Sequence, residues 1–212
     1  MPSKYHARIG ELTGNLVHLY KTVTDDSDVS AGMPWYPKAH GIMTEWADNY
    51  GLPIATAACV TAAISPQCDW NRNLIIADEI LAGAVAPSIG GALHTNIAKA
   101  RSIYRDRATT TFGYFKSGPK VASFAANLAG DYSLVTVDTH AVQAALCDVE
   151  ATVGLKWTQY EAFASAYIHA AKRVRLEPAM FQAVIWHTWK RIYPPAKKRS
   201  YRTQWTGDLG EC

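Results

Sequence analysis

Two ionisable residues near the middle of the chain stand at the starts of predicted helices. Lys120 follows Gly118 and Pro119, and a Gly-Pro pair that opens an apolar helix leaves backbone N–H groups free to bind a phosphate. Asp138 follows residues 134–137, whose β-branched and apolar side chains favour an extended chain, and its carboxylate is typical of a helix N-cap. An amine and a carboxylate at such positions can act as a nucleophile and as a stabiliser of positive charge.

Apolar residues at helical spacing predict the elements that carry this pair. The expected fold is all-α, because about nine or ten segments show this spacing and none shows the alternation of a strand. The main expected helices are residues 4–22, 36–50, 54–64, 70–82, 94–104, 119–128, 139–146, 158–173 and 178–192. Residues 54–64 are almost all Ala, Val, Thr and Ile, which predicts a helix buried on most sides. Segment 24–34 is rich in aspartate and contains Gly32 and Pro34, so we expect it to be a loop.

The composition bounds the class of protein. The 212 residues, 49% of them hydrophobic, suffice for a full core without disulfides or a structural metal. The 4 cysteines show no C-x-x-C spacing, which argues against a zinc ribbon or an iron–sulfur loop and favours a reducing, intracellular setting. We therefore expect no metal and no cofactor. Because the chain has no apolar run of about 18 residues and no signal-peptide core, we expect a soluble cytoplasmic protein without a membrane partner.

Basic residues gather near the C-terminus, although the net charge is only +3. They alternate there with Trp189, Tyr193, Tyr201 and Trp205, a mixture typical of surfaces that contact a phosphate backbone. The basic residues of this region are Lys190, Arg191, Lys197, Lys198, Arg199 and Arg202. The alternative interpretation is a solvated tail that keeps the protein soluble.

Three segments carry a pattern that is informative as a set. Residues 114–122 read Y-F-K-S-G-P-K-V-A, residues 137–140 read V-D-T-H, and residues 63–67 read A-I-S-P-Q. Together they resemble the helix-hairpin-helix DNA glycosylase superfamily of the endonuclease III and oxoguanine glycosylase type. That family has a hairpin L-P-G-V-G-x-K-[TV]-A, a V-D-x-H segment and an L-S-x-Q turn. Lys116 and Ser117 depart from the hairpin pattern, so the loop is expected to differ in shape from that of the family.

The resemblance implies an architecture of two helical lobes with a cleft between them and a helix-hairpin-helix motif. The chain would be a single glycosylase-like unit. Its central lobe would be residues 53–134, its second lobe residues 1–52 plus 135–195, and its basic irregular tail residues 196–212. The implied partner is double-stranded DNA, bound by a monomer with one base flipped out of the duplex.

The resemblance also implies a reaction, namely excision of a damaged or modified base with AP lyase activity. Asp138 would stabilise the oxocarbenium character that develops at the sugar when the glycosidic bond breaks. Lys120 would attack the same carbon and form a Schiff base, since a lysine at this position implies a bifunctional member of the family. The alternatives left open are a phosphate clamp for Lys120 and a purely structural N-cap for Asp138.

The same resemblance suggests contact residues around the pair. Gln67 would fill the space left by the flipped base. Further DNA contacts are expected from the hairpin residues Lys116, Ser117 and Gly118 and from the tail residues Lys197, Lys198 and Arg199. The expected base pocket contains Trp70, Tyr114 and His140, although aromatic residues at helical spacing also suit a core and His140 also suits a helix start.

Two further functions fit the same residues. The stretch S-P-Q-x-x-W-x-x-N at residues 65–73 resembles bacteriophage relatives of these glycosylases that are thought to process hypermodified pyrimidines. Such a protein would act in the cytoplasm of the host cell. A non-catalytic DNA-binding module that uses only the hairpin and the basic tail is the third possibility.

Overall fold

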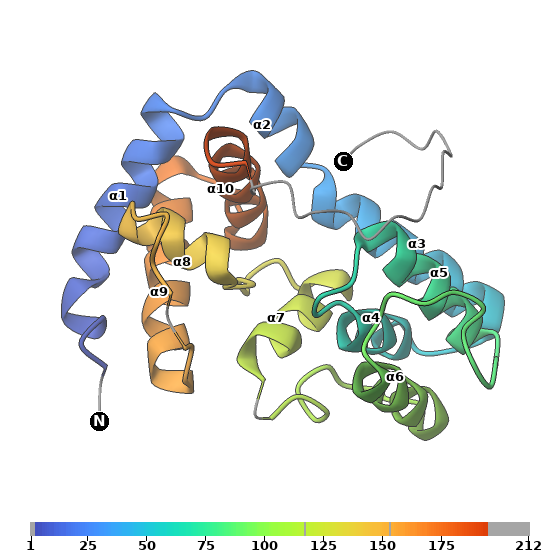
Figure 1. Ribbon diagram of the computed structural model, residues 1–212. Coiled ribbons are helices and arrows are strands. Elements are labelled where there is room, and N and C mark those ends of the chain that lie inside the picture. Colours follow the sequence, from blue (N-terminus) through green and yellow to red (C-terminus); the bar gives the residue numbers. More distant parts are fainter. Residues whose placement is uncertain (1–2, 117, 153, 195–212) are drawn as a thin grey trace.

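The computed structural model describes residues 3–116, 118–152 and 154–194, and over these ranges every regular element is a helix (Figure 1), which confirms the all-α prediction. The elements are η1 (His6–Arg8), α1 (Ile9–Thr22), α2 (Asp26–Gly32), α3 (Trp35–Tyr50), α4 (Ile54–Ile64), α5 (Trp70–Leu81), α6 (His94–Asp106), α7 (Pro119–Leu128), α8 (Thr139–Leu146), α9 (Trp157–Val174) and α10 (Pro178–Ile192). Within the described ranges, none of these helices combines the length and the apolar character that crossing a membrane requires.

Two large hydrophobic clusters hold the helices together. The first joins α1, α8, α9 and α10 through aromatic residues such as Phe163, Tyr167 and Phe181. The second joins α3, α5, α6 and α7 around α4, which Figure 1 shows at the centre of this group. Ala39 and Met43 of α3 belong to the second cluster. Residues 35–50 therefore pack with the central helices, whereas the division expected from the sequence puts residues 1–52 in the other lobe.

Helix α4 is the buried centre of the second cluster, as its composition predicts. Pro53 precedes the helix, and every residue from Ala55 to Ile64 is buried. Small side chains allow neighbouring helices to approach closely, so four helices pack around this short one. The ring of Pro66 prevents continuation of the helix beyond Ser65.

Helix α2 corrects the expectation that residues 24–34 form a loop. Its start is a capping box in which Asp25 Oδ1 accepts hydrogen bonds from the backbone N–H groups of Ser27 (2.9 Å) and Asp28 (3.1 Å). The Asp28 side chain in turn accepts from the Asp25 N–H at 3.1 Å. Asp25 and Asp28 thus cap a helix that runs from Asp26 to Gly32, so the prediction of a loop at residues 24–34 is wrong.

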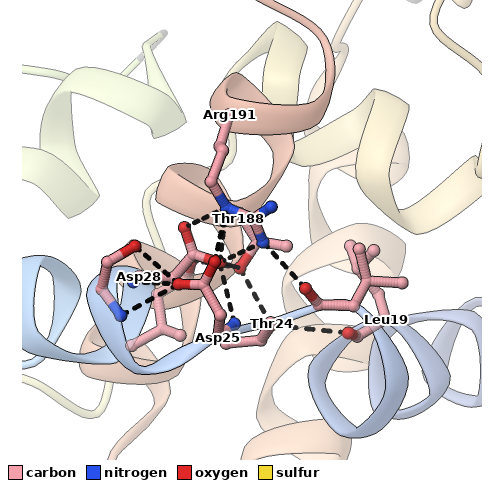
Figure 2. Close-up of polar contacts among 9 residues, drawn as sticks. Leu19, Thr24, Asp25, Asp28, Thr188 and Arg191 are labelled. Atoms are coloured by element: carbon pink, nitrogen blue, oxygen red, sulfur yellow. Dashed lines mark hydrogen bonds and ion pairs between the residues drawn. The ribbon is translucent and has the colours of Figure 1, made fainter.

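Asp28 also joins α2 to α10 (Figure 2). Its carboxylate is 3% exposed and accepts from Arg191 Nη2 at 2.7 Å and from Thr188 Oγ1 at 3.1 Å. Burial acts to raise the pKa of Asp28, but the hydrogen bonds from Arg191, the Asp25 N–H and Thr188 outweigh it and hold the pKa below its ordinary value. The two helices meet at Gly32, where an added Cβ would lie 2.5 Å from Val184 Cα. Only glycine fits this contact.

Candidate functional site

Helix α7 begins at the predicted hairpin, where Pro119 is buried and Lys120 is exposed. The Gly118 N–H donates to Phe115 O at 2.8 Å and closes the turn, and Pro119 occupies the first turn of the helix. No side chain caps this start among the described residues, and Lys120 is exposed. The indole Nε1 of Trp157 in α9 donates to Lys116 O at 3.0 Å, so α9 supports the turn that leads to Lys120. The amine of Lys120 is therefore accessible to a large ligand.

Helix α8 begins at Asp138, which confirms the predicted N-cap. Asp138 Oδ1 accepts from the Ala141 N–H at 2.8 Å, and Oδ2 accepts from the indole Nε1 of Trp186 in α10 at 3.3 Å. The Asp138 residue is half-buried. Both oxygens are thus held, one by its own helix and one by a helix that follows much later in the chain.

Buried tyrosines fix the segment that leads to Asp138. The Tyr160 hydroxyl donates to Val135 O at 2.6 Å and accepts from the Val137 N–H at 3.2 Å. The hydroxyl of Tyr167 donates to Ala141 O at 3.0 Å. Burial raises the pKa of both tyrosines, and the negative charge of Asp138 adds to the effect. Both hydroxyls therefore stay neutral while they hold the backbone on either side of the carboxylate.

A row of aromatic and polar side chains continues from Asp138 along α8 and α10. The ammonium of Lys190 lies 4.0 Å from the centroid of the Trp186 ring. His140 lies edge-on to the same ring at 6.3 Å, and its Nδ1 is 3.3 Å from Gln143 Oε1. His140 therefore lies close to the helix start, beside the indole that binds Asp138.

Gln67 lies at the tip of a tight turn in the second cluster. The Cys68 N–H donates to Ser65 O at 3.2 Å across the turn, and Gln67 has a left-handed φ of 62°. A residue other than glycine or asparagine is uncommon in this conformation and costs free energy there. Asn96 of α6 fixes the turn through a 3.3 Å hydrogen bond to Pro66 O. The result is an exposed amide side chain on a rigid base.

Three half-buried aromatic rings lie next to one another between α3, α5 and α7. The ring centroids of Trp35 and Trp70 are 5.1 Å apart, and Phe124 lies 6.1 Å from Trp35 and 6.3 Å from Trp70. Phe124 follows Lys120 by four residues, so the two side chains project from the same face of α7. Trp70 is thus part of a half-buried aromatic group that includes Phe124 of α7.

The other two residues of the expected base pocket have separate surroundings. The Tyr114 hydroxyl donates to Asp106 at the end of α6, and this hydrogen bond raises the pKa of Tyr114 to about 12. His140 lies beside Trp186. Trp70, Tyr114 and His140 therefore belong to three different groups of contacts.

Lys120 and Asp138 form no ion pair with each other within the part of the chain that the structure describes. Two hollows on the surface, of about 330 and 160 Å³, are lined by neither residue. The first is lined by His169, Lys172 and Arg173, and the second by Gly83, Ala84, Arg101, Tyr104 and Arg105. Of the expected DNA contacts, Ser117, Lys197, Lys198 and Arg199 lie outside the described residues.

The sequence does not indicate Trp186 as a partner of Asp138, and it marks Lys190 only as one of the basic residues near the C-terminus. Trp186 lies within the expected helix 178–192, whose buried residues include Phe181, Val184, Ile185 and Trp189. A tryptophan followed by a lysine four residues later is a pair that meets on a helix surface, and this spacing was the available signal.

The chain belongs to the family described as "Family of unknown function (DUF7178)", whose profile matches residues 3–192. No curated protein and no solved structure matches the chain.

Proposed function

We propose that this member of DUF7178 is a DNA base-excision glycosylase with AP lyase activity. Asp138 is its charge-stabilising carboxylate and Lys120 its nucleophile. The motifs at residues 114–122 and 137–140 suggest this reaction, and the geometry of Asp138 is the observation that carries the proposal.

The carboxylate of Asp138 is held in a way that suits a developing positive charge. It is half-buried, and each oxygen accepts one hydrogen bond, from the Ala141 N–H and from Trp186. A carboxylate offers about four lone-pair sites, so about two remain for a cationic sugar or a water. Because its position is fixed before the reaction, little free energy is lost in reorganisation when the charge develops.

Lys120 supplies the second part of the reaction. Its neutral amine attacks the anomeric carbon, the bond between that carbon and the base breaks, and the base leaves with the bonding electrons and takes up a proton. Loss of a proton from the amine and opening of the sugar then give the Schiff base. Removal of an adjacent sugar proton expels the 3′ phosphate, which cleaves the strand.

Two further regions support DNA as the substrate. The rigid turn at Gln67 presents a polar side chain that can enter a duplex where a base has left. The rings of Trp35, Trp70 and Phe124 offer a partly exposed aromatic surface on the side of α7 that carries Lys120. Bases stack well on such surfaces.

The test is a panel of duplexes, each with one altered base, assayed separately for base release and for strand cleavage. Wild-type protein should release at least one base and form a covalent complex that borohydride traps. Lys120→Ala should abolish the trapped complex, and Asp138→Asn, which keeps a good N-cap, should slow base release. Lys21→Ala on α1 removes an equally exposed charge and should change neither activity.

Other outcomes decide between this proposal and its alternatives. A trapped complex that persists in Lys120→Ala contradicts the role of the lysine. Activity confined to hypermodified pyrimidines would assign the phage-type reaction. Duplex binding without base release on any member of the panel would favour a binding module.

A further inference from the structure

The contact between Trp186 and Asp138 joins α10 to the carboxylate of the proposed reaction. Trp186 lies on α10, and its indole Nε1 donates to Asp138 Oδ2 at 3.3 Å. A tryptophan that serves only as a core residue needs a hydrogen-bond partner, but a backbone carbonyl would serve equally well. Here the partner is the one carboxylate that the proposed reaction requires.

The two hydrogen bonds on Asp138 restrict different motions. The bond from the Ala141 N–H to Oδ1 fixes the carboxylate relative to α8, as any N-cap does. Alone, it restrains the torsion about the bond to the carboxyl carbon through one oxygen, and this torsion is broad in aspartate. The bond from Trp186 to Oδ2 restrains the second oxygen and thus adds to the control of the plane of the group.

Lys190 strengthens the indole as a donor. Its ammonium lies over the ring face, 4.0 Å from the centroid, where the electron density of the ring attracts a cation. A cation in this position draws electron density from the ring, which makes the N–H more positive, and linked polar contacts of this kind reinforce one another. The ammonium of Lys190 therefore contacts the indole of Trp186, and the indole contacts the carboxylate of Asp138.

We propose that Trp186 is a positioning residue for Asp138 and that Lys190 supports it through the face of the indole. This inference rests on the proposed function for its role in catalysis, but the contact itself can be tested without any activity. Trp186 touches no reacting atom in this scheme and acts only through the orientation of the carboxylate.

The first experiment measures the contact directly by NMR of the indole N–H signals. The chain has 7 tryptophans, and each contributes one such signal. Trp186→Phe identifies the signal that belongs to Trp186. Relative to wild type, that signal should shift upfield in Asp138→Asn, and it should shift in the same direction but by a smaller amount in Lys190→Gln. The matched control is Trp46→Phe on α3, which should leave the Trp186 signal in place. A Trp186 signal that is unaffected by Asp138→Asn overturns the proposal.

The second experiment measures the consequence for base release. Trp186→Phe keeps a ring at this position but removes the donor, and we expect kcat to fall about 10-fold, the usual scale for one hydrogen bond to a charged group. KM for the duplex should stay unchanged, because the substrate does not touch the indole. Lys190→Gln should lower kcat about 2- to 3-fold, since it weakens the indole as a donor without removing the N–H. Lys190→Arg keeps the positive charge and should keep kcat at the wild-type value.

The two experiments separate failure of this inference from failure of the proposed function. If wild-type protein releases no base while the Trp186 signal responds to Asp138→Asn, the contact stands and the glycosylase proposal falls. If base release is normal in Trp186→Phe, or if KM rises in place of a fall in kcat, the positioning role is wrong.

Discussion

The starts of α7 and α8 differ in how the rest of the molecule holds them. At α8 the Asp138 carboxylate caps its own helix, accepts from Trp186 of α10 and follows a segment bound by Tyr160 of α9. At α7 the described residues include no side-chain cap, and Lys120 is exposed. A charge-stabilising carboxylate must stay where the charge develops, whereas an amine on a four-carbon stem can reach its target. The difference suits the two proposed roles.

Replacement of the fixed group should have the largest effect. We expect Asp138→Ala to slow base release about 100-fold or more, as loss of a preorganised electrostatic contact does. It should also lower the free energy of unfolding by about 1 kcal/mol through loss of the cap. Single-turnover kinetics and urea denaturation measure the two effects. Thr139→Ala, at the exposed next residue, serves as the control, and an equal loss of activity there would contradict the prediction.

The support behind Asp138 should be the next most sensitive point. Tyr160→Phe leaves the buried Val135 carbonyl and Val137 N–H without their partner, which should lower the free energy of unfolding by about 2 kcal/mol. Urea denaturation gives this value, and hydrogen exchange should show faster exchange at Val137. A loss smaller than about 0.5 kcal/mol, the range of neutral surface changes, would mean that the segment is held by other contacts.

The start of α2 extends the comparison to a third helix start, where Asp28 is part of a capping box. The pKa of Asp28 is lowered in the folded protein, so its contribution to stability is full above the ordinary aspartate pKa of about 3.9 and is lost as the pH falls through the lower folded value. Between pH 7 and pH 3, the free energy of unfolding should fall by roughly 1 kcal/mol more in wild type than in Asp28→Asn. Equal losses in the two proteins would show that the pairing with Arg191 does not stabilise the fold.

The helix start without a side-chain cap should give the smallest effect on stability. Lys120→Ala removes an exposed side chain, so the free energy of unfolding should change by less than about 0.5 kcal/mol. Thermal denaturation compared with wild type provides the measurement. A larger change would show that Lys120 is part of the fold, and the contrast between the two helix starts would then be wrong.

Local signals predicted much of this structure. The cap at Asp138 and the Pro at the start of α7 are both properties of a few adjacent residues. The aspartates of residues 24–34 favour a loop by composition, but Asp25 and Asp28, three residues apart, form the capping box of α2. The hydrogen bond from Trp186 to Asp138 spans 48 residues, and no local pattern specifies such a contact. The fold class was thus accessible from the sequence, but the surroundings of the carboxylate were not.

The small residues of α4 have a further consequence, which concerns the entropy of folding. Alanine has no side-chain rotamers to lose, so a helix of this composition becomes ordered at a low entropic cost even though each residue buries little apolar area. Larger residues at these positions would bury more surface but would push apart the four helices that contact α4. The second cluster therefore depends on close approach and not on large side chains, and it should tolerate loss of a methyl group better than gain of one.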